Sequence, residues 1–179
     1  AVAAEVFARF RARSAPQLVY GFPGSALVSI NDEAVHGVPG PRVVQSGDIV
    51  KFDVTAELDG YIADAAETVL VEPATEEMLP LSRGTKLALE AGLEAARGGK
   101  RIYDIGRAVQ DEAKRHQLTV LRQLSGHGVG RTIHEAPEVP NYPVGGVSQI
   151  LPEGLVIAIE PVLSTGSSRV VDSPDGWTL

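Results

Sequence analysis

The chain has 179 residues, of which 44% are hydrophobic and 22% are charged, enough apolar material for one globular domain with a substantial core. Its 23 acidic and 16 basic residues give a net charge of −7, which argues against nucleic-acid binding because a phosphate backbone requires a basic surface. We recognise no signal peptide and no apolar stretch near the about 18 residues of a membrane span, so we expect a cytoplasmic protein with no membrane partner.

The first half of the chain predicts one helix and three strands. Residues 1–13 have apolar side chains at helical spacing, and Pro16 is expected to end that helix. A short strand is predicted at 27–30, after a turn-rich segment. Two longer strands are predicted at 49–55 and 61–71, where apolar and β-branched residues gather.

The second half predicts two helices, at 81–97 and 104–116, the latter N-capped by Asp104. A glycine- and histidine-rich segment at 126–138 is expected to be irregular. Further strands are predicted at 119–124, 155–163 and 169–171. We therefore expect an α+β fold in which helices cover one face of a largely antiparallel sheet, with residues 1–179 forming a single domain.

The dipeptide Asp59-Gly60 between two strand patterns is a strong hairpin signal, because the turn needs positive φ and glycine supplies it. With these two as turn residues, Asp53 faces Ala66. By the same register, Thr55 faces Asp64. The two aspartates then lie diagonally on one face, with Cβ atoms roughly 7 Å apart. A solvated acidic face would explain this pattern, and so would a pair of divalent metal ions that offset the repulsion between the carboxylates.

Three further residues could bind a metal. His127 stands among glycines at 126, 128 and 130, which allow close backbone approach and leave the imidazole open to a ligand. His134 follows on an extended segment, and Glu160 ends an apolar run. A structural histidine and a strand-end carboxylate in solvent are the simpler interpretations. With no cysteine in the chain, carboxylates and imidazoles would suit Mn²⁺, Fe²⁺, Co²⁺ or Zn²⁺ in a two-metal hydrolytic site.

Short motifs with recognisable spacing run from residue 21 to the end of the chain. They are Gly21-Phe22-Pro23-x-Ser25, Ser29-Ile30-Asn31 with His36-Gly37-Val38-Pro39, Gly47-Asp48-Ile49-Val50 with Asp53-Val54-Thr55, Asp59-Gly60-Tyr61 with Asp64, Gly126-His127-Gly128-Val129-Gly130-Arg131 with His134-Glu135-x-Pro137, Ile159-Glu160-Pro161, and Asp175-Gly176-Trp177-Thr178. Each is weak alone, whereas the ordered set is specific. Through it the chain resembles the type 1 methionine aminopeptidases, metallopeptidases of the pita-bread (creatinase/aminopeptidase-like) fold.

The resemblance implies four metal ligands, namely Asp53, Asp64, His127 and Glu160. Asp64 would bridge two divalent ions (Co, Mn, Fe or Zn), and Glu160 would also accept the proton of the metal-bound water. His36 and His134 would hydrogen-bond the scissile peptide and stabilise the developing oxyanion.

The resemblance also implies a substrate pocket and a reaction. Phe22, Ile133 and Trp177 would form its apolar wall. Thr55 would lie beside the metal ligands without binding the metal itself. The implied activity is removal of N-terminal methionine from nascent polypeptides, by attack of metal-bound hydroxide on the peptide bond.

Some features depart from the family pattern. The family's fifth ligand, a glutamate on a strand beyond Trp177, is absent, so we expect a chain truncated at both ends with weakened metal binding and little activity. Alanines flank Asp64 where the family has glycine and small hydroxyl residues, and Leu27 replaces a frequent cysteine. Two alternatives stay open: a prolidase or Xaa-Pro aminopeptidase of the same fold, and a non-catalytic pita-bread binding protein.

Overall fold

The computed structural model describes residues 1–146 and 149–179, which form two compact units. The first comprises Ala1–Thr75, Val129–His134 and Val171–Leu179, and the second comprises Glu76–Gly128 and Glu135–Val170. The mixed helix and sheet content confirms the α+β prediction, whereas the single catalytic domain over 1–179 stays a prediction. Within the described residues, no helix combines the length and apolar character that crossing a membrane requires.

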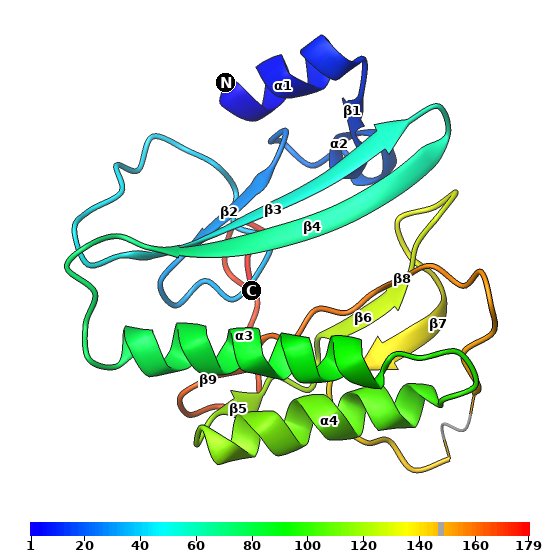
Figure 1. Ribbon diagram of the computed structural model, residues 1–179. Helices are drawn as coiled ribbons and strands as arrows, with labels where there is room; N and C mark the ends of the chain where they lie inside the picture. The colour runs from blue at the N-terminus through cyan, green and yellow to red at the C-terminus, as the bar shows by residue number, and fades with distance from the viewer. Residues whose placement is uncertain (147–148) are drawn as a thin grey trace. The chain divides into compact units, whose positions relative to one another are not determined.

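The first unit is built on a four-stranded antiparallel sheet (Figure 1). Strand β3 is central: it pairs with β4 on one side and with β1 and β2 on the other. Its elements are α1 (Val2–Phe10), β1 (Arg13–Ser14), α2 (Ala15–Tyr20), β2 (Leu27–Ile30), β3 (Ile49–Leu58) and β4 (Tyr61–Leu70).

The hairpin of β3 and β4 has the predicted register. Asp53 is opposite Ala66, and Thr55 is opposite Asp64. The turn residues Asp59 and Gly60 have φ values of +53° and +80°, as a two-residue turn that matches the twist of the strands requires. The sequence-based prediction of this element is confirmed, with the first strand three residues longer than expected.

The predicted end of the first helix is wrong. Helix α1 already stops at Phe10, where Arg11 adopts a left-handed conformation with φ of +57°. Pro16 instead lies in the first turn of α2, where a helix needs no backbone N–H donor. The buried Ala15 of α2 packs with Ile62, Val129 and Ile133, a cluster that we call the small core.

The second unit has two long helices lying side by side (Figure 1) and two small sheets. Strand β6 lies between β7 and β8, and β5 pairs with β9. Its larger core is centred on fully buried side chains of α4 and on Val139 of β7. The elements are α3 (Met78–Ala95), α4 (Ile102–Arg115), β5 (Thr119–Val120), β6 (Ser125–Gly128), β7 (Glu135–Pro140), β8 (Ile157–Ala158) and β9 (Leu163–Ser164).

The strand predictions in this unit need correction. The apolar run 155–163 yields only β8 and β9, because Pro161 has no N–H for a ladder. The segment 126–138 was expected to be irregular, yet it takes part in β6 and β7. Glycines depress the strand signal there, although they are required by packing. The predicted strand 119–124 shrinks to two residues, and 169–171 is not a strand.

The N-cap of α4 is also reassigned. The helix begins at Ile102, and Asp104 occupies the third helical position. The Asp104 carboxylate accepts a hydrogen bond from the Arg101 N–H at 3.1 Å, as the acidic member of a capping box does. Asp104 therefore stabilises the helix start from inside the first turn.

Candidate functional site

Two aspartates share one face of the β3–β4 hairpin in the first unit. Because side chains alternate along a strand, Asp53 and Thr55 point to the same face, and Asp64 joins them from across the pair. Both aspartates are partly exposed, whereas Thr55 is only 4% exposed. Two carboxylates on one face of a hairpin repel each other, and a cation between them would stabilise both ionised forms.

A second pair, His127 and Glu160, forms within the second unit. Antiparallel pairing of β6 with β8 places His127 opposite Ala158, two residues before Glu160. The strands approach so closely that a Cβ on Gly126 would lie 2.2 Å from the Ala158 carbonyl oxygen. The prediction that glycine permits close backbone approach is thus confirmed at Gly126. His127 itself is buried, with 8% of its surface exposed, and its role as a ligand stays a prediction.

The His127–Glu160 contact joins two hydrogen-bond acceptors. His127 Nδ1 lies 2.9 Å from the Gly128 carbonyl oxygen, which can only accept, so Nδ1 carries a proton. In the neutral ring Nε2 is then an acceptor, and it lies 3.1 Å from Glu160 Oε1. That oxygen is enclosed and accepts no hydrogen bond from the described residues, although the Glu160 side chain is 43% exposed.

Such a pair needs a positive charge, supplied by a proton or by a metal ion. Two atoms that bind one ion at about 2.1 Å each are separated by roughly 3 Å, the spacing seen here. The donor chemistry therefore fits a divalent cation. Within residues 1–146 and 149–179 no three His, Asp or Glu side chains cluster around one point. The predicted ligands form two pairs, one in each unit.

His36 lies exposed on a loop that is bonded to β2. Its backbone is left-handed, with φ of +61°, which is uncommon for a residue with a side chain. The next residue, Gly37, donates its N–H to Ser29 Oγ at 2.9 Å. Its carbonyl accepts the Val28 N–H at 2.8 Å. These bonds hold the His36 backbone in its strained conformation.

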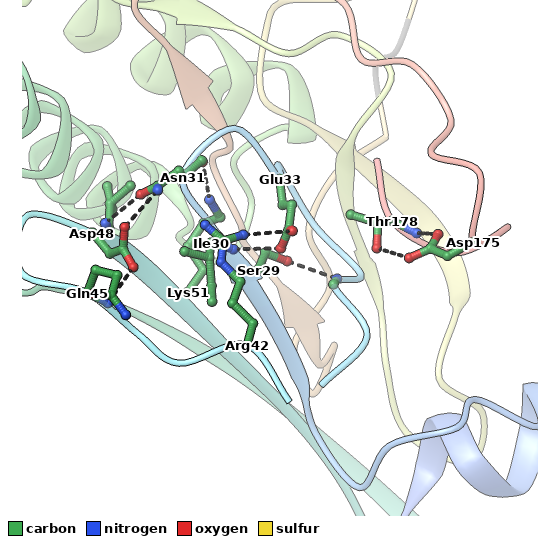
Figure 2. Close-up of polar contacts among 12 residues, drawn as sticks. Ser29, Ile30, Asn31, Glu33, Arg42, Gln45, Asp48, Lys51, Asp175 and Thr178 are labelled. Carbon is green, nitrogen blue, oxygen red and sulfur yellow. Dashed lines mark hydrogen bonds and ion pairs between the residues drawn. The ribbon is translucent and has the colours of Figure 1, made fainter. Parts of the chain in front are cut away.

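A polar network fixes the start of this loop (Figure 2). The Asn31 side chain donates to Asp48 Oδ1 at 2.8 Å and accepts the Ile49 N–H at 3.0 Å. Lys51 Nζ donates to the Asn31 carbonyl at 3.2 Å, and burial lowers the pKa of this ammonium group. Hydrogen bonds from the Gln45 N–H and from Asn31 lower the pKa of the Asp48 carboxyl group.

The residues expected to form the substrate pocket divide between two clusters of the first unit. Phe22 meets Trp177 edge to face, with ring centroids 5.2 Å apart. The chain near Trp177 is held by Thr178, whose hydroxyl donates to Asp175 at 2.6 Å. Ile133 is 4% exposed and belongs to the small core. Phe22 is only 3% exposed, so the partly exposed Trp177 is the member of this pair that can offer an apolar surface. Ile133 anchors the segment that carries His134.

Sequence reasoning missed several supporting residues. Gly37 and Ser29 belong to the sequence motifs without a predicted role, although a glycine after a candidate histidine signals a close approach. Asp48 and Asn31 carry turn signals that do not reveal their mutual contact. Tyr20, whose hydroxyl lies 2.8 Å from His134 Nδ1, gave no signal, because 114 residues separate the two.

The family model described as metallopeptidase family M24 matches residues 1–177. The chain belongs to metallopeptidase family M24. It is 47% identical to a methionine aminopeptidase of Treponema pallidum over 161 residues, which are 89% of this chain and 63% of that protein. It is 39% identical to methionine aminopeptidase 2 of Bacillus subtilis, over 93% of this chain and 68% of that protein. The chain thus spans about two thirds of the length of these M24 relatives.

Solved structures of M24 proteins agree with this assignment. Methionine aminopeptidase from Thermotoga maritima matches with a TM-score of 0.91 and 38% identity, covering 98% of this chain and 71% of that one. Prolidase from Pyrococcus furiosus matches with a TM-score of 0.66 and 27% identity, covering 77% of this chain and 41% of that one. This M24 chain has the pita-bread fold.

The close contact at Gly37 makes a testable prediction. A Cβ at this position would lie 2.2 Å from the Val28 carbonyl oxygen, so Gly37→Ala forces the loop off β2. We expect a loss of about 1–3 kcal/mol in the free energy of unfolding, measured by urea denaturation. Gly40→Ala is the control, since the nearest atom would be 4.0 Å away. Equal stability of the two variants would contradict the proposed packing.

The Asp48 network makes a pH-dependent prediction. Because its pKa is lower in the folded chain, Asp48 stabilises the fold above the unfolded pKa of about 3.9, and the gain is lost as pH falls through the folded pKa. Asp48→Asn should therefore cost stability at neutral pH, and its difference from wild type should shrink as the pH is lowered below about 4. Urea unfolding at several pH values measures this. Asp111→Asn, at an exposed site, is the control for removing one negative charge. A pH-independent difference between Asp48→Asn and wild type would contradict the prediction.

Proposed function

We propose that this chain is the catalytic part of a methionine aminopeptidase, which removes N-terminal methionine from polypeptides. The divalent ions, two of Mn, Fe, Co or Zn, would be held by Asp53, Asp64, His127 and Glu160. The observation that carries the proposal is the contact of two acceptors, His127 Nε2 and Glu160 Oε1, at 3.1 Å. A cation resolves that contact, and the paired carboxylates of the hairpin call for a cation for the same reason.

Similarity favours a methionine aminopeptidase over a prolidase. The Thermotoga maritima methionine aminopeptidase covers 98% of this chain at a TM-score of 0.91, against 77% and 0.66 for the Pyrococcus furiosus prolidase. Trp177, which is partly exposed and packed on the buried Phe22, would also suit an unbranched apolar side chain at the start of a peptide. Xaa-Pro dipeptides therefore serve as the comparison substrates.

The proposed roles of the residues follow from their chemistry. The ions, when bound, would activate water and polarise the scissile carbonyl. The Glu160 carboxylate would accept a proton from the attacking water and return it to the leaving amine. His36 and His134 would donate hydrogen bonds to the substrate carbonyl as it gains negative charge. Strict placement of their backbones matters, because such donors act only when aimed at the developing charge.

The hairpin offers a matched test of the ligand assignment. We expect Asp53→Asn to weaken Mn²⁺ or Co²⁺ binding, measured by isothermal titration, by more than the about 10–100-fold typical of losing an outer hydrogen-bond partner. In the complete protein the same change should abolish turnover of a Met-Ala-Ser peptide. Glu67→Gln is the control, because Glu67 is an exposed carboxylate on the opposite face of β4.

Three outcomes would contradict the proposal. Unchanged metal binding and turnover in Asp53→Asn would exclude Asp53 as a ligand. Faster cleavage of Xaa-Pro dipeptides than of the Met-Ala-Ser peptide would favour a prolidase. Failure of the wild-type chain to retain metal after supplementation with Co²⁺ or Mn²⁺ would favour a non-catalytic binding protein.

A further inference from the structure

Tyr20 makes a direct contact with one of the proposed catalytic histidines. Its hydroxyl oxygen lies 2.8 Å from His134 Nδ1, and the two ring centroids are 6.1 Å apart. Both side chains are exposed, so the contact is not a by-product of core packing. The Tyr20 hydroxyl is therefore placed to act on the His134 imidazole, in addition to the other contacts of that residue.

Both backbones that carry this contact are anchored in the first unit. Val129 and Ile133 are buried in the small core together with Ala15, the first residue of α2, which ends at Tyr20. The Gly130 carbonyl accepts the backbone N–H of Ile62 in β4 at 2.8 Å. The segment before His134 and the helix that bears Tyr20 are thus held by one set of contacts, which fixes the distance between the two side chains.

Side chains of the same segment reinforce its position. Arg131 donates to the Gly60 carbonyl at 3.1 Å and to the Tyr61 hydroxyl at 2.7 Å. Its guanidinium also lies over the Tyr61 ring, 3.7 Å from the centroid. Thr132 donates its hydroxyl to the His134 carbonyl at 3.0 Å. These contacts hold the backbone of His134, and the Tyr20 contact acts on its ring.

The Tyr20 hydroxyl controls both the ring and its proton. A neutral imidazole carries its proton on one nitrogen, and the partner of the other nitrogen decides which one. A phenol O–H is a better donor to an imidazole nitrogen than an imidazole N–H is to a phenol oxygen. A hydroxyl that donates to Nδ1 would keep the proton of His134 on Nε2.

We propose that Tyr20 is a positioning residue that holds the His134 imidazole in the Nε2–H form, ready to donate from Nε2 to the substrate carbonyl. This inference rests on the proposed peptidase function, because that function supplies the acceptor. It adds a residue to the site that the sequence motifs do not contain. Without the Tyr20 hydroxyl, part of the population would carry the proton on Nδ1 and could not donate from Nε2.

The decisive measurement is the tautomer of His134, which requires neither metal nor turnover. Nitrogen NMR of the ¹⁵N-histidine-labelled chain at about pH 8, where imidazoles are neutral, distinguishes the two forms. The His134 signal is assigned by its loss in His134→Gln. We expect the Nε2–H form in wild type and a mixture in Tyr20→Phe. Tyr61→Phe is the matched control: it removes a hydroxyl bonded to the same segment, keeps the ring under Arg131 and leaves the tautomer unchanged.

Kinetics of the complete protein test the consequence. Tyr20→Phe should lower kcat for a Met-Ala-Ser peptide by about tenfold, in the range for loss of a hydrogen-bond partner that orients a site residue, with KM nearly unchanged. A wild-type Nδ1–H form, an unchanged tautomer in Tyr20→Phe, or an altered tautomer with unchanged kcat would each overturn the inference. Absence of wild-type turnover would contradict the peptidase function, while the NMR measurement would still decide whether Tyr20 sets the proton.

Discussion

The two-residue turn at Asp59-Gly60 is the constraint on which the rest of the first unit depends. Both residues have positive φ, so the strands leave the turn in a fixed register that persists over the whole ladder. A slip of one residue would send Asp64 to the opposite face of the sheet. The backbone therefore creates the pair of aspartates, and it keeps them together against their mutual repulsion.

The second unit also brings together groups that repel each other, here two hydrogen-bond acceptors. There the Gly128 carbonyl settles the proton on one nitrogen of His127, and short pairing between β6 and β8 brings the other nitrogen to Glu160. Each unit thus contains a local arrangement that is unfavourable without a positive charge. Folding supplies the energy for both, through the ladders that carry these residues and through the cores of the two units.

Local signals made much of the fold predictable. The hairpin, strand β2 and the two long helices followed from turn chemistry and periodicity, which act over a few residues. The placement of Asp53 beside Asp64 followed from the same register. Strand β6 is not predicted because glycine has a low strand propensity. The strand predicted at 155–163 is too long, because its apolar residues give a strand signal across Pro161.

Other parts of the site could not be read from local patterns. The pairing of His127 with Glu160 depends on a two-residue strand, so its assignment came from the family resemblance rather than from spacing. The contacts of Ser29 with Gly37 and of Tyr20 with His134 arise only once distant segments are folded together. Sequence reasoning proposes candidate site residues more readily than the groups that hold them in place.

The close contact of Gly37 with β2 links the position of Val28 to that of His36. Gly37 packs against Val28 with no room for a methyl group. A displacement of Val28 would therefore move Gly37 and the adjoining His36 with it. Leu27, the neighbouring strand position, lies opposite Asp53. In the proposed peptidase, a substitution at Leu27 that shifts this strand would therefore also shift His36.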